Sequence, residues 1–116
     1  MNKLVCPNGT FEISVAKTFF SRFIGLMFMS QKSFCGGLLI PKCSSIHTFF
    51  MRFYIDVVFL DKTNKVLRTV KNLKPWCMVA PVSFAKSVVE LKAGFIDKFG
   101  IKEGITLSLQ YQINVE

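Results

Sequence analysis

The most constraining feature of the sequence is a series of short β-type segments separated by turn residues. The clearest lies near the C-terminus, where apolar and polar residues alternate over residues 105–113. Other runs are rich in β-branched and aromatic residues or alternate in the same way: residues 10–15, 45–53, 54–60, 66–70 and 87–91. The crossover helices of a βαβ fold are missing between them. The chain is therefore expected to be mostly β, a small antiparallel β-barrel or a jelly-roll-like sandwich.

One helix is expected in the N-terminal half of the chain. Thr18 can cap it, and it continues to about Met29. Apolar residues at helical spacing support it: Phe19, Phe20, Phe23, Ile24, Met27 and Phe28. A single further helical turn is expected over residues 95–99, and residues 61–65 (DKTNK) form the turn that makes residues 66–70 a hairpin partner.

Length and composition set the outer limits. The chain has 116 residues, of which 51% are hydrophobic, so residues 1–116 are expected to form a single domain that buries a core without metals or disulfides. The uncharged stretch over residues 75–85 is too short to span a bilayer and contains two prolines. The N-terminus lacks the apolar region of a secretory signal, so a cytoplasmic location is expected.

Metal chemistry has little support in the sequence. The four cysteines, Cys6, Cys35, Cys43 and Cys77, show no C-x-x-C spacing, and His47 is the single histidine. Reduced thiols without a metal or other cofactor are the expectation. A Cys–His dyad of His47 with Cys43 or Cys35 is conceivable, but no known nucleophile signature surrounds these residues.

The formal charge of +8 raises the question of nucleic acid. The lysines, however, are dispersed along the chain, and arginine, the preferred base reader, occurs three times. Dispersed lysines are typical of solvated strand edges, where they discourage edge-to-edge pairing. Because it is dispersed, the charge gives little support to a nucleic-acid partner, and a nucleic-acid-binding β-barrel stays an alternative that salt-dependent binding would reveal.

Two carboxylates stand where apolar residues are expected. Asp56 lies within residues 54–60, and Glu90 lies within residues 87–91. A buried carboxylate must be paired, hydrogen-bonded or protonated, because burying it bare costs several kcal/mol. Asp56 is a general base or polar anchor in one interpretation, and in the other it pairs with Arg52 or accepts backbone N–H bonds. The two acids could converge as an acid/base pair or face opposite sides.

Aromatic residues and a methionine supply the other candidates for a binding site. If residues 45–53 form one strand, alternation places His47, Phe49 and Met51 on one face and Phe50 on the other. Trp76 follows Pro75 in a loop, where an aromatic residue can line a ligand site or plug the end of a barrel.

The order of short motifs resembles a known family. The motifs are Val15-Ala16-Lys17-Thr18, Arg22, Gly25-Leu26-Met27, Gly37-Leu38-Leu39, Ser45 to Met51 (SIHTFFM), Ile55 to Asp61 (IDVVFLD), Leu73-Lys74-Pro75-Trp76, Val88-Val89-Glu90-Leu91 with Gly94, and Ile101-Lys102-Glu103-Gly104. Over residues 13–109 the chain resembles Domain of Unknown Function 192, a family of small, uncharacterised bacterial and archaeal proteins. The resemblance implies a mostly-β, barrel-like or jelly-roll-like domain and brings no established activity.

The chain departs from the family pattern at two positions. Tyr54 replaces the proline that usually precedes the hydrophobic-Asp step at Asp56, and Ile105 follows Gly104 where the family has an aspartate. The sharp turn before residue 55 and any role of the second acid are therefore not implied for this chain.

The function is not determined by these features, and three hypotheses remain. The leading one is a non-catalytic or unassigned small β domain that binds a small ligand or a protein partner through an aromatic and carboxylate pocket. Its candidate residues are His47, Phe49, Phe50, Met51, Asp56, Trp76 and Glu90. The second is an enzyme such as a hydrolase that uses Asp56, Glu90 or His47. The third is the nucleic-acid-binding barrel. The oligomeric state is open.

Overall fold

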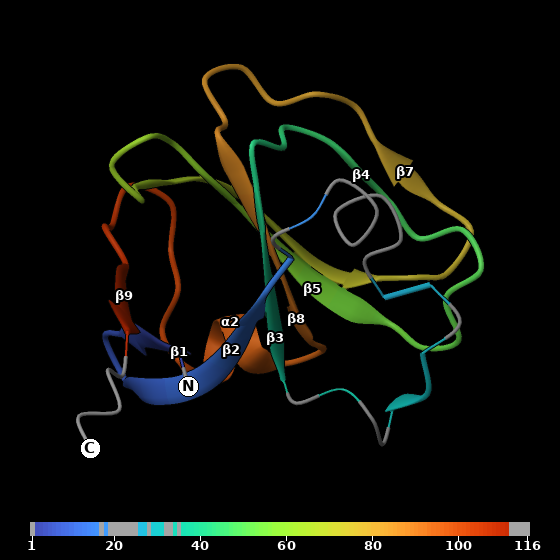
Figure 1. Ribbon diagram of the computed structural model, residues 1–116, viewed down its shortest axis with the longest axis horizontal. Coiled ribbons are helices and arrows are strands. Elements are labelled where there is room, and N and C mark those ends of the chain that lie inside the picture. Colours follow the sequence, from blue (N-terminus) through green and yellow to red (C-terminus); the bar gives the residue numbers. More distant parts are fainter. Residues whose placement is uncertain are drawn as a thin grey trace.

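The computed structural model describes residues 2–16, 18, 26–27, 29–31, 34 and 36–111 (Figure 1). Most of these residues belong to strands or their connections, and one short helix follows β8. The elements are β1 (Asn2–Cys6), β2 (Gly9–Val15), β3 (Gly37–Pro41), β4 (Ile46–His47), β5 (Ile55–Leu60), β6 (Val66–Leu73), β7 (Met78–Val79), β8 (Ser87–Lys92), α2 (Phe95–Lys98) and β9 (Ser108–Tyr111). The expectation of a mostly-β fold is confirmed.

Seven strands form one curled sheet in the order β6-β5-β8-β3-β2-β1-β9, and β4 pairs with β7 in a separate two-stranded sheet. The pairings within the large sheet are antiparallel except that of β2 with β3, which is parallel. Figure 1 shows the sheet bending so strongly that it forms a half-barrel.

The two ends of this sheet approach each other just before β9. The Val66 N–H donates to the Ile105 carbonyl at 2.8 Å, and the Leu107 N–H donates to the Asn64 carbonyl at 2.9 Å. These bonds tie the start of β6 to the segment that leads into β9. Edge groups that would otherwise be open to another chain are therefore partly satisfied within the molecule.

The central strand β5 explains why its sequence, IDVVFL, is so apolar. All six of its residues are buried, because β6 and β8 flank it and apolar groups cover both faces of the sheet. The strand matches the prediction for residues 54–60, and β6 extends the predicted hairpin partner to Leu73.

Two clusters of buried side chains lie on opposite faces of the central strands. The first is completed by the helical turn α2 and consists of Leu4, Cys6, Ile13, Val58, Leu60, Val66, Val89, Leu91, Ile96, Phe99, Ile101 and Leu107. The second lies under the β4–β7 pair and contains Leu26, Phe34, Ile46, Met51, Phe53, Ile55, Val57, Phe59, Val79, Ala85 and Val88. We call the first cluster the inner core and the second cluster the outer core.

The predicted strand over residues 45–53 is wrong. The strand β4 ends at His47, and a turn follows, in which the Met51 N–H donates to the Thr48 carbonyl at 3.2 Å. Phe50 adopts a positive φ of 62°, which breaks the alternation on which that prediction rested. The aromatic residues of this segment favour a strand by propensity. The backbone of the buried Thr48 instead makes hydrogen bonds to Met51, Trp76 and Cys77, and the bond to Met51 closes a turn.

Other predictions fare differently. The helical turn expected over residues 95–99 is present as α2. The last strand is shorter than residues 105–113, since β9 begins at Ser108, and residues 112–113 lie outside the described residues. The predicted helix from Thr18 to about Met29 falls mostly on residues 19–25 and 28, which also lie outside them. In the described part of the chain, no helix is long and apolar enough to cross a membrane.

Candidate functional site

Asp56 is the polar residue of β5, and both oxygens of its carboxylate accept hydrogen bonds from backbone N–H groups. The Asn72 N–H donates to Oδ1 at 3.0 Å, and the Gly94 and Ile96 N–H groups donate to Oδ2, each at 3.0 Å. The residue is 1% exposed. Asp56 therefore joins the end of β6 to the start of α2, whose first N–H groups have no partner within the helix.

Glu90 is the polar residue of β8, and its surroundings are apolar. It is 3% exposed, and its Oε2 has no hydrogen-bond partner among the described residues. Burial raises the pKa of the Glu90 carboxyl to about 8, since removal from water penalises the charged form. Glu90 is therefore a neutral acid at pH 7.

The sheet keeps these two acids apart. Val57 lies directly opposite Glu90 in the pairing of β5 with β8, so the two side chains share one face. Asp56 precedes Val57 and thus points to the opposite face, toward α2. Asp56 and Glu90 consequently do not form the acid/base pair that the hydrolase hypothesis considered.

A residue that the sequence interpretation did not single out, Thr48, organises the rest of the candidate site. It is fully buried, and its hydroxyl donates to the Lys74 carbonyl at 2.7 Å and accepts from the Cys77 N–H at 2.8 Å. Its backbone N–H donates to the Cys77 carbonyl at 2.7 Å, and its carbonyl accepts from the Trp76 N–H at 2.9 Å. A single hydroxyl residue inside the mostly apolar run of residues 46–51 was the signal that could have revealed it.

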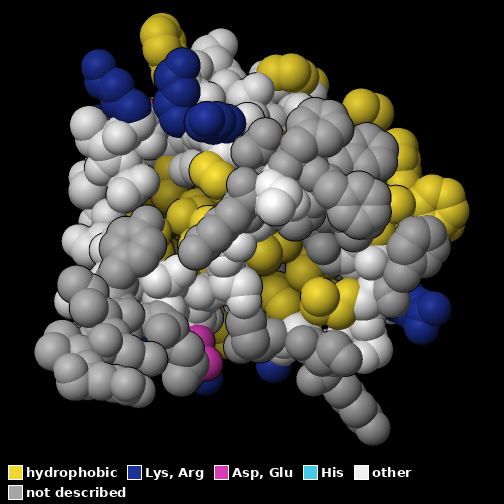
Figure 2. All heavy atoms as spheres, in the orientation of Figure 1, with side chains coloured by type: hydrophobic (Ala, Val, Ile, Leu, Met, Phe, Trp, Pro, Cys, Tyr) yellow, Lys and Arg dark blue, Asp and Glu magenta, His cyan; other side chains and the backbone are white. Residues whose placement is uncertain are grey.

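This anchoring brings four rings together. His47 stacks on Phe49 with 5.0 Å between centroids, Phe49 lies 6.2 Å from Trp76, and Phe50 lies 4.7 Å from Trp76. Met78 of β7 pairs with His47 in register and is 68% exposed. We call His47, Phe49, Phe50, Trp76 and Met78 the aromatic platform. Figure 2 shows hydrophobic side chains at the right edge of the view, where β4 and β7 lie in Figure 1.

The remaining predicted residue, Met51, does not belong to the platform. Its side chain is 5% exposed and packs in the outer core. Of the seven predicted site residues, the structure thus gathers His47, Phe49, Phe50 and Trp76, and it places Met51, Asp56 and Glu90 in the interior.

The aromatic platform has two features that are unusual in a folded chain: positive φ angles at bulky residues and exposed aromatic rings. Phe50 and Trp76 have φ values of 62° and 65°, in the left-handed region that bulky side chains avoid. Both rings nevertheless remain 45% and 60% exposed. Such strain is of the order of 1–3 kcal/mol per residue and persists only where the surroundings hold it. Because both rings stay exposed, their burial does not offset this strain.

With this geometry in place, the comparison with protein families becomes informative. The sequence profile of DUF192, described as an uncharacterized ACR, matches residues 4–109. The chain belongs to the DUF192 family. The resemblance drawn from the motif order is therefore confirmed.

Relatives and solved structures agree with this assignment. A UPF0127 protein of Thermococcus sibiricus is 35% identical over 108 residues, which are 90% of this chain and 70% of the relative. A UPF0127 protein of Pyrococcus furiosus is 36% identical over 96 residues, 80% of this chain and 82% of the relative. The crystal structure of a protein of unknown function from Novosphingobium aromaticivorans superposes with a TM-score of 0.76 at 19% identity, covering 95% of this chain and 83% of that one. The comparisons thus establish family and fold.

Proposed function

We propose that this DUF192 chain is a binding module whose aromatic platform docks an acidic, apolar segment of a partner protein. The observation that carries the proposal is the exposure of Phe50 and Trp76 at strained backbone positions that Thr48 fixes from beneath. Strained residues cluster at ligand clamps and other functional sites, where the surrounding structure over-determines them.

The shape of the platform favours a protein segment over a small molecule. Small-molecule sites are concave and bury most of their ligand, whereas Phe50, Trp76 and Met78 project with 45–68% of their surface exposed. Exposed tryptophan and arginine side chains are the residue types that dominate protein–protein binding energy, and methionine adapts to varied apolar partners.

The charge around the platform specifies the partner further. The two segments that carry it, residues 42–55 and 74–86, contain Lys42, Arg52, Lys74 and Lys86, and their sequence includes no acidic residue. Arg52 and Lys74 are exposed and lie two positions along the chain from Phe50 and Trp76. An acidic partner segment would find complementary charge there, which speeds association and sets specificity.

A peptide selection tests the proposal. Random twelve-residue peptides displayed on phage are selected against the immobilised full chain, and enriched peptides are then synthesised and titrated by calorimetry and by the emission of Trp76, the single tryptophan. We expect enriched peptides to combine acidic residues with large apolar ones. We also expect Trp76→Ala to weaken their binding at least about 30-fold, the effect of losing a hot-spot side chain.

Phe84→Ala is the matched control, because Phe84 is also an exposed aromatic residue, 83% exposed, but lies outside the platform. It should bind the peptides as the parent chain does. Equal binding by Trp76→Ala and the parent would overturn the proposal. So would the absence of peptide enrichment, or a saccharide panel that shifts Trp76 emission while no peptide does.

A further inference from the structure

We propose that a second site, separate from the aromatic platform, binds a small anion that carries a planar ring, of the nucleoside monophosphate class. The site is a cavity of about 410 Å³ between the β5–β6 turn and the segment that leads into β8, and it is lined by Asp61, Lys62, Lys65, Leu67, Phe84 and Lys86. A volume of this size lies within the usual range of small-molecule pockets, about 300–1,000 Å³.

The cavity carries an excess of positive charge. Lys62, Lys65 and Lys86 supply three ammonium groups against the one carboxylate of Asp61. That carboxylate already serves the turn, since its Oδ1 accepts from the Thr63 N–H and hydroxyl, each at 2.8 Å, and from the Lys65 N–H at 3.0 Å. Lysine is a common phosphate-binding residue in proteins. The polar chemistry of the cavity therefore suits an anion.

Phe84 supplies the reason to expect a planar group on that anion. The Ala85 N–H donates to the Val82 carbonyl at 3.1 Å, which makes Phe84 the third residue of a tight turn, and its φ is 67°. Glycine is favoured at such a position because it tolerates a positive φ. The phenylalanine here is 83% exposed and therefore adds little to the core. The stability of the fold does not explain why residue 84 is a phenylalanine, whereas stacking against a ring of the ligand does.

The walls of the cavity are fixed by backbone hydrogen bonds. The Lys86 N–H donates to the Leu60 carbonyl at 2.8 Å, the Asp61 N–H donates to the Lys65 carbonyl at 3.0 Å, and the Val82 N–H donates to the Ser44 carbonyl at 2.9 Å. The lysines and Phe84 are thus presented from a frame that is tied to the end of β5. Such a frame reduces the ordering that binding would otherwise require.

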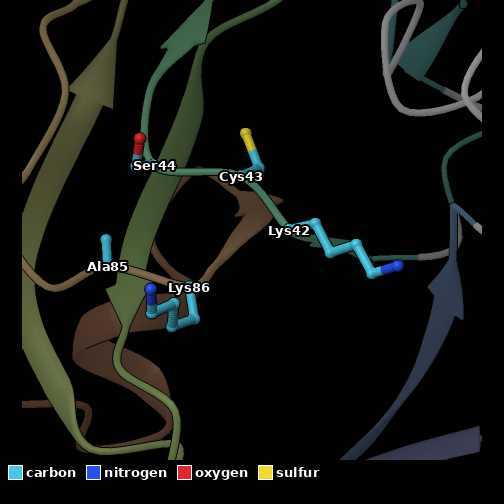
Figure 3. A pocket seen from close by; sticks show the side chains of 5 residues that line it. All are labelled: Lys42, Cys43, Ser44, Ala85 and Lys86. Atoms are coloured by element: carbon cyan, nitrogen blue, oxygen red, sulfur yellow. The ribbon is translucent and has the colours of Figure 1, made fainter.

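Lys86 also borders a second hollow of about 310 Å³ with Lys42, Cys43, Ser44 and Ala85 (Figure 3). In this view Lys42 extends away from Lys86, so the two ammonium groups do not point at one spot. In Figure 2, basic side chains gather at the top of the view, over the connections that stand highest in Figure 1. Lys42 therefore adds a further cation outside the cavity, across a hollow that Lys86 also borders.

Calorimetric titration of the full chain with adenosine 5′-monophosphate, adenosine and inorganic phosphate tests the site. We expect the monophosphate to bind, with adenosine and phosphate each at least tenfold weaker, because each lacks one of the two recognised parts. Lys65→Gln and Lys86→Gln should each weaken the monophosphate several-fold and reduce the salt dependence of its binding.

Phe84→Gly separates binding from folding. It should weaken the binding of the monophosphate about tenfold. The melting temperature of the chain should stay equal or rise, since glycine relieves the strain of the positive φ. Trp76→Ala and Lys102→Gln, an exposed lysine outside the cavity, are the controls and should bind as the parent does. No monophosphate binding at about 1 mM, equal binding of adenosine, or unchanged binding by Phe84→Gly would overturn the proposal.

Discussion

Asp56 and Glu90 lie on neighbouring strands, β5 and β8, and are almost equally buried, yet the fold treats them in opposite ways. Asp56 faces the inner core beside α2, where three backbone N–H groups end on its carboxylate. Glu90 faces the outer core, and its Oε2 meets no donor within the described part of the chain. An acidic residue in a buried strand is therefore a structural joint on one face and an uncompensated acid on the other.

The difference shows that burial alone does not decide what an acid costs a protein. A helix start and a strand end on one face of the sheet offer free N–H groups, so a carboxylate there satisfies donors that would otherwise be orphaned. Apolar side chains on the other face offer none, so the acid keeps its proton. Substitutions at Asp56, Glu90 and Thr48, with their controls, can break or sharpen this comparison.

The largest effect is expected for Asp56→Ala. It leaves three N–H groups without an acceptor, one in a buried and two in part-buried hydrogen bonds, at about 1–3 kcal/mol each, so the free energy of unfolding should fall by about 5 kcal/mol. Urea denaturation measures it. Asp56→Asn retains one acceptor oxygen and should lose less.

Asp61→Ala is the matched control for that variant. Asp61 also accepts three hydrogen bonds, but at the surface, where water replaces the lost acceptor, so its loss should be clearly smaller. Similar losses at the two positions would contradict the view that burial makes Asp56 a structural joint.

Glu90 predicts a pH dependence of stability. The folded chain holds its proton up to about pH 8, whereas an unfolded glutamate releases it near pH 4.5. The folded state thus binds more protons across this window, and stability should fall as pH rises from about 4.5 to 8, by at most about 1.4 kcal/mol per pH unit. Thermal or urea unfolding from pH 4 to 9 measures it.

Glu90→Gln mimics the protonated acid and isolates this contribution. The difference in stability between variant and parent should be near constant below pH 4.5 and should grow in favour of the variant by about 4 kcal/mol up to pH 8. A difference that does not change with pH would refute the neutral, unpartnered acid.

The smallest of these effects is expected for Thr48→Val, which tests the joint beneath the platform. Valine keeps the shape but leaves the Lys74 carbonyl and the Cys77 N–H without their partner, so stability should fall by about 2 kcal/mol. The fluorescence anisotropy of Trp76 should fall as well. Thr48→Ser retains the hydroxyl and should preserve the anisotropy, and a Thr48→Val variant that also preserves it would disprove the anchoring role.

Much of the strand pattern was readable from local sequence. Residues 54–60 and 87–91 become β5 and β8 because β-branched and aromatic side chains suit a strand that is covered on both faces. Residues 45–53 have the same composition, and there the prediction failed. Thr48 bonds to a loop 26–29 residues further along the chain, and no local pattern reports such a contact.

The candidate site was predictable in residue type and only partly in place. Phe49, Phe50 and Trp76 were predicted as binding-site candidates from their residue type and position, and they do come together. Alternation would have separated Phe49 from Phe50, and it was the turn after Thr48 that let both reach Trp76. Phe84 and the lysines around it had no motif, because their cavity forms only where the β5–β6 turn meets the segment before β8.

The sequence by itself determined the mostly-β class, the family and the presence of two acids in apolar strands, because these follow from residue type and spacing. Only the tertiary structure decided that Asp56 receives donors from residues 16 to 40 positions away while Oε2 of Glu90 meets none among the described residues. The physical reason is that strand order and register place a residue beside its partners. A local sequence carries the side chain's chemistry, but the neighbouring strands supply the hydrogen bonds that set its role.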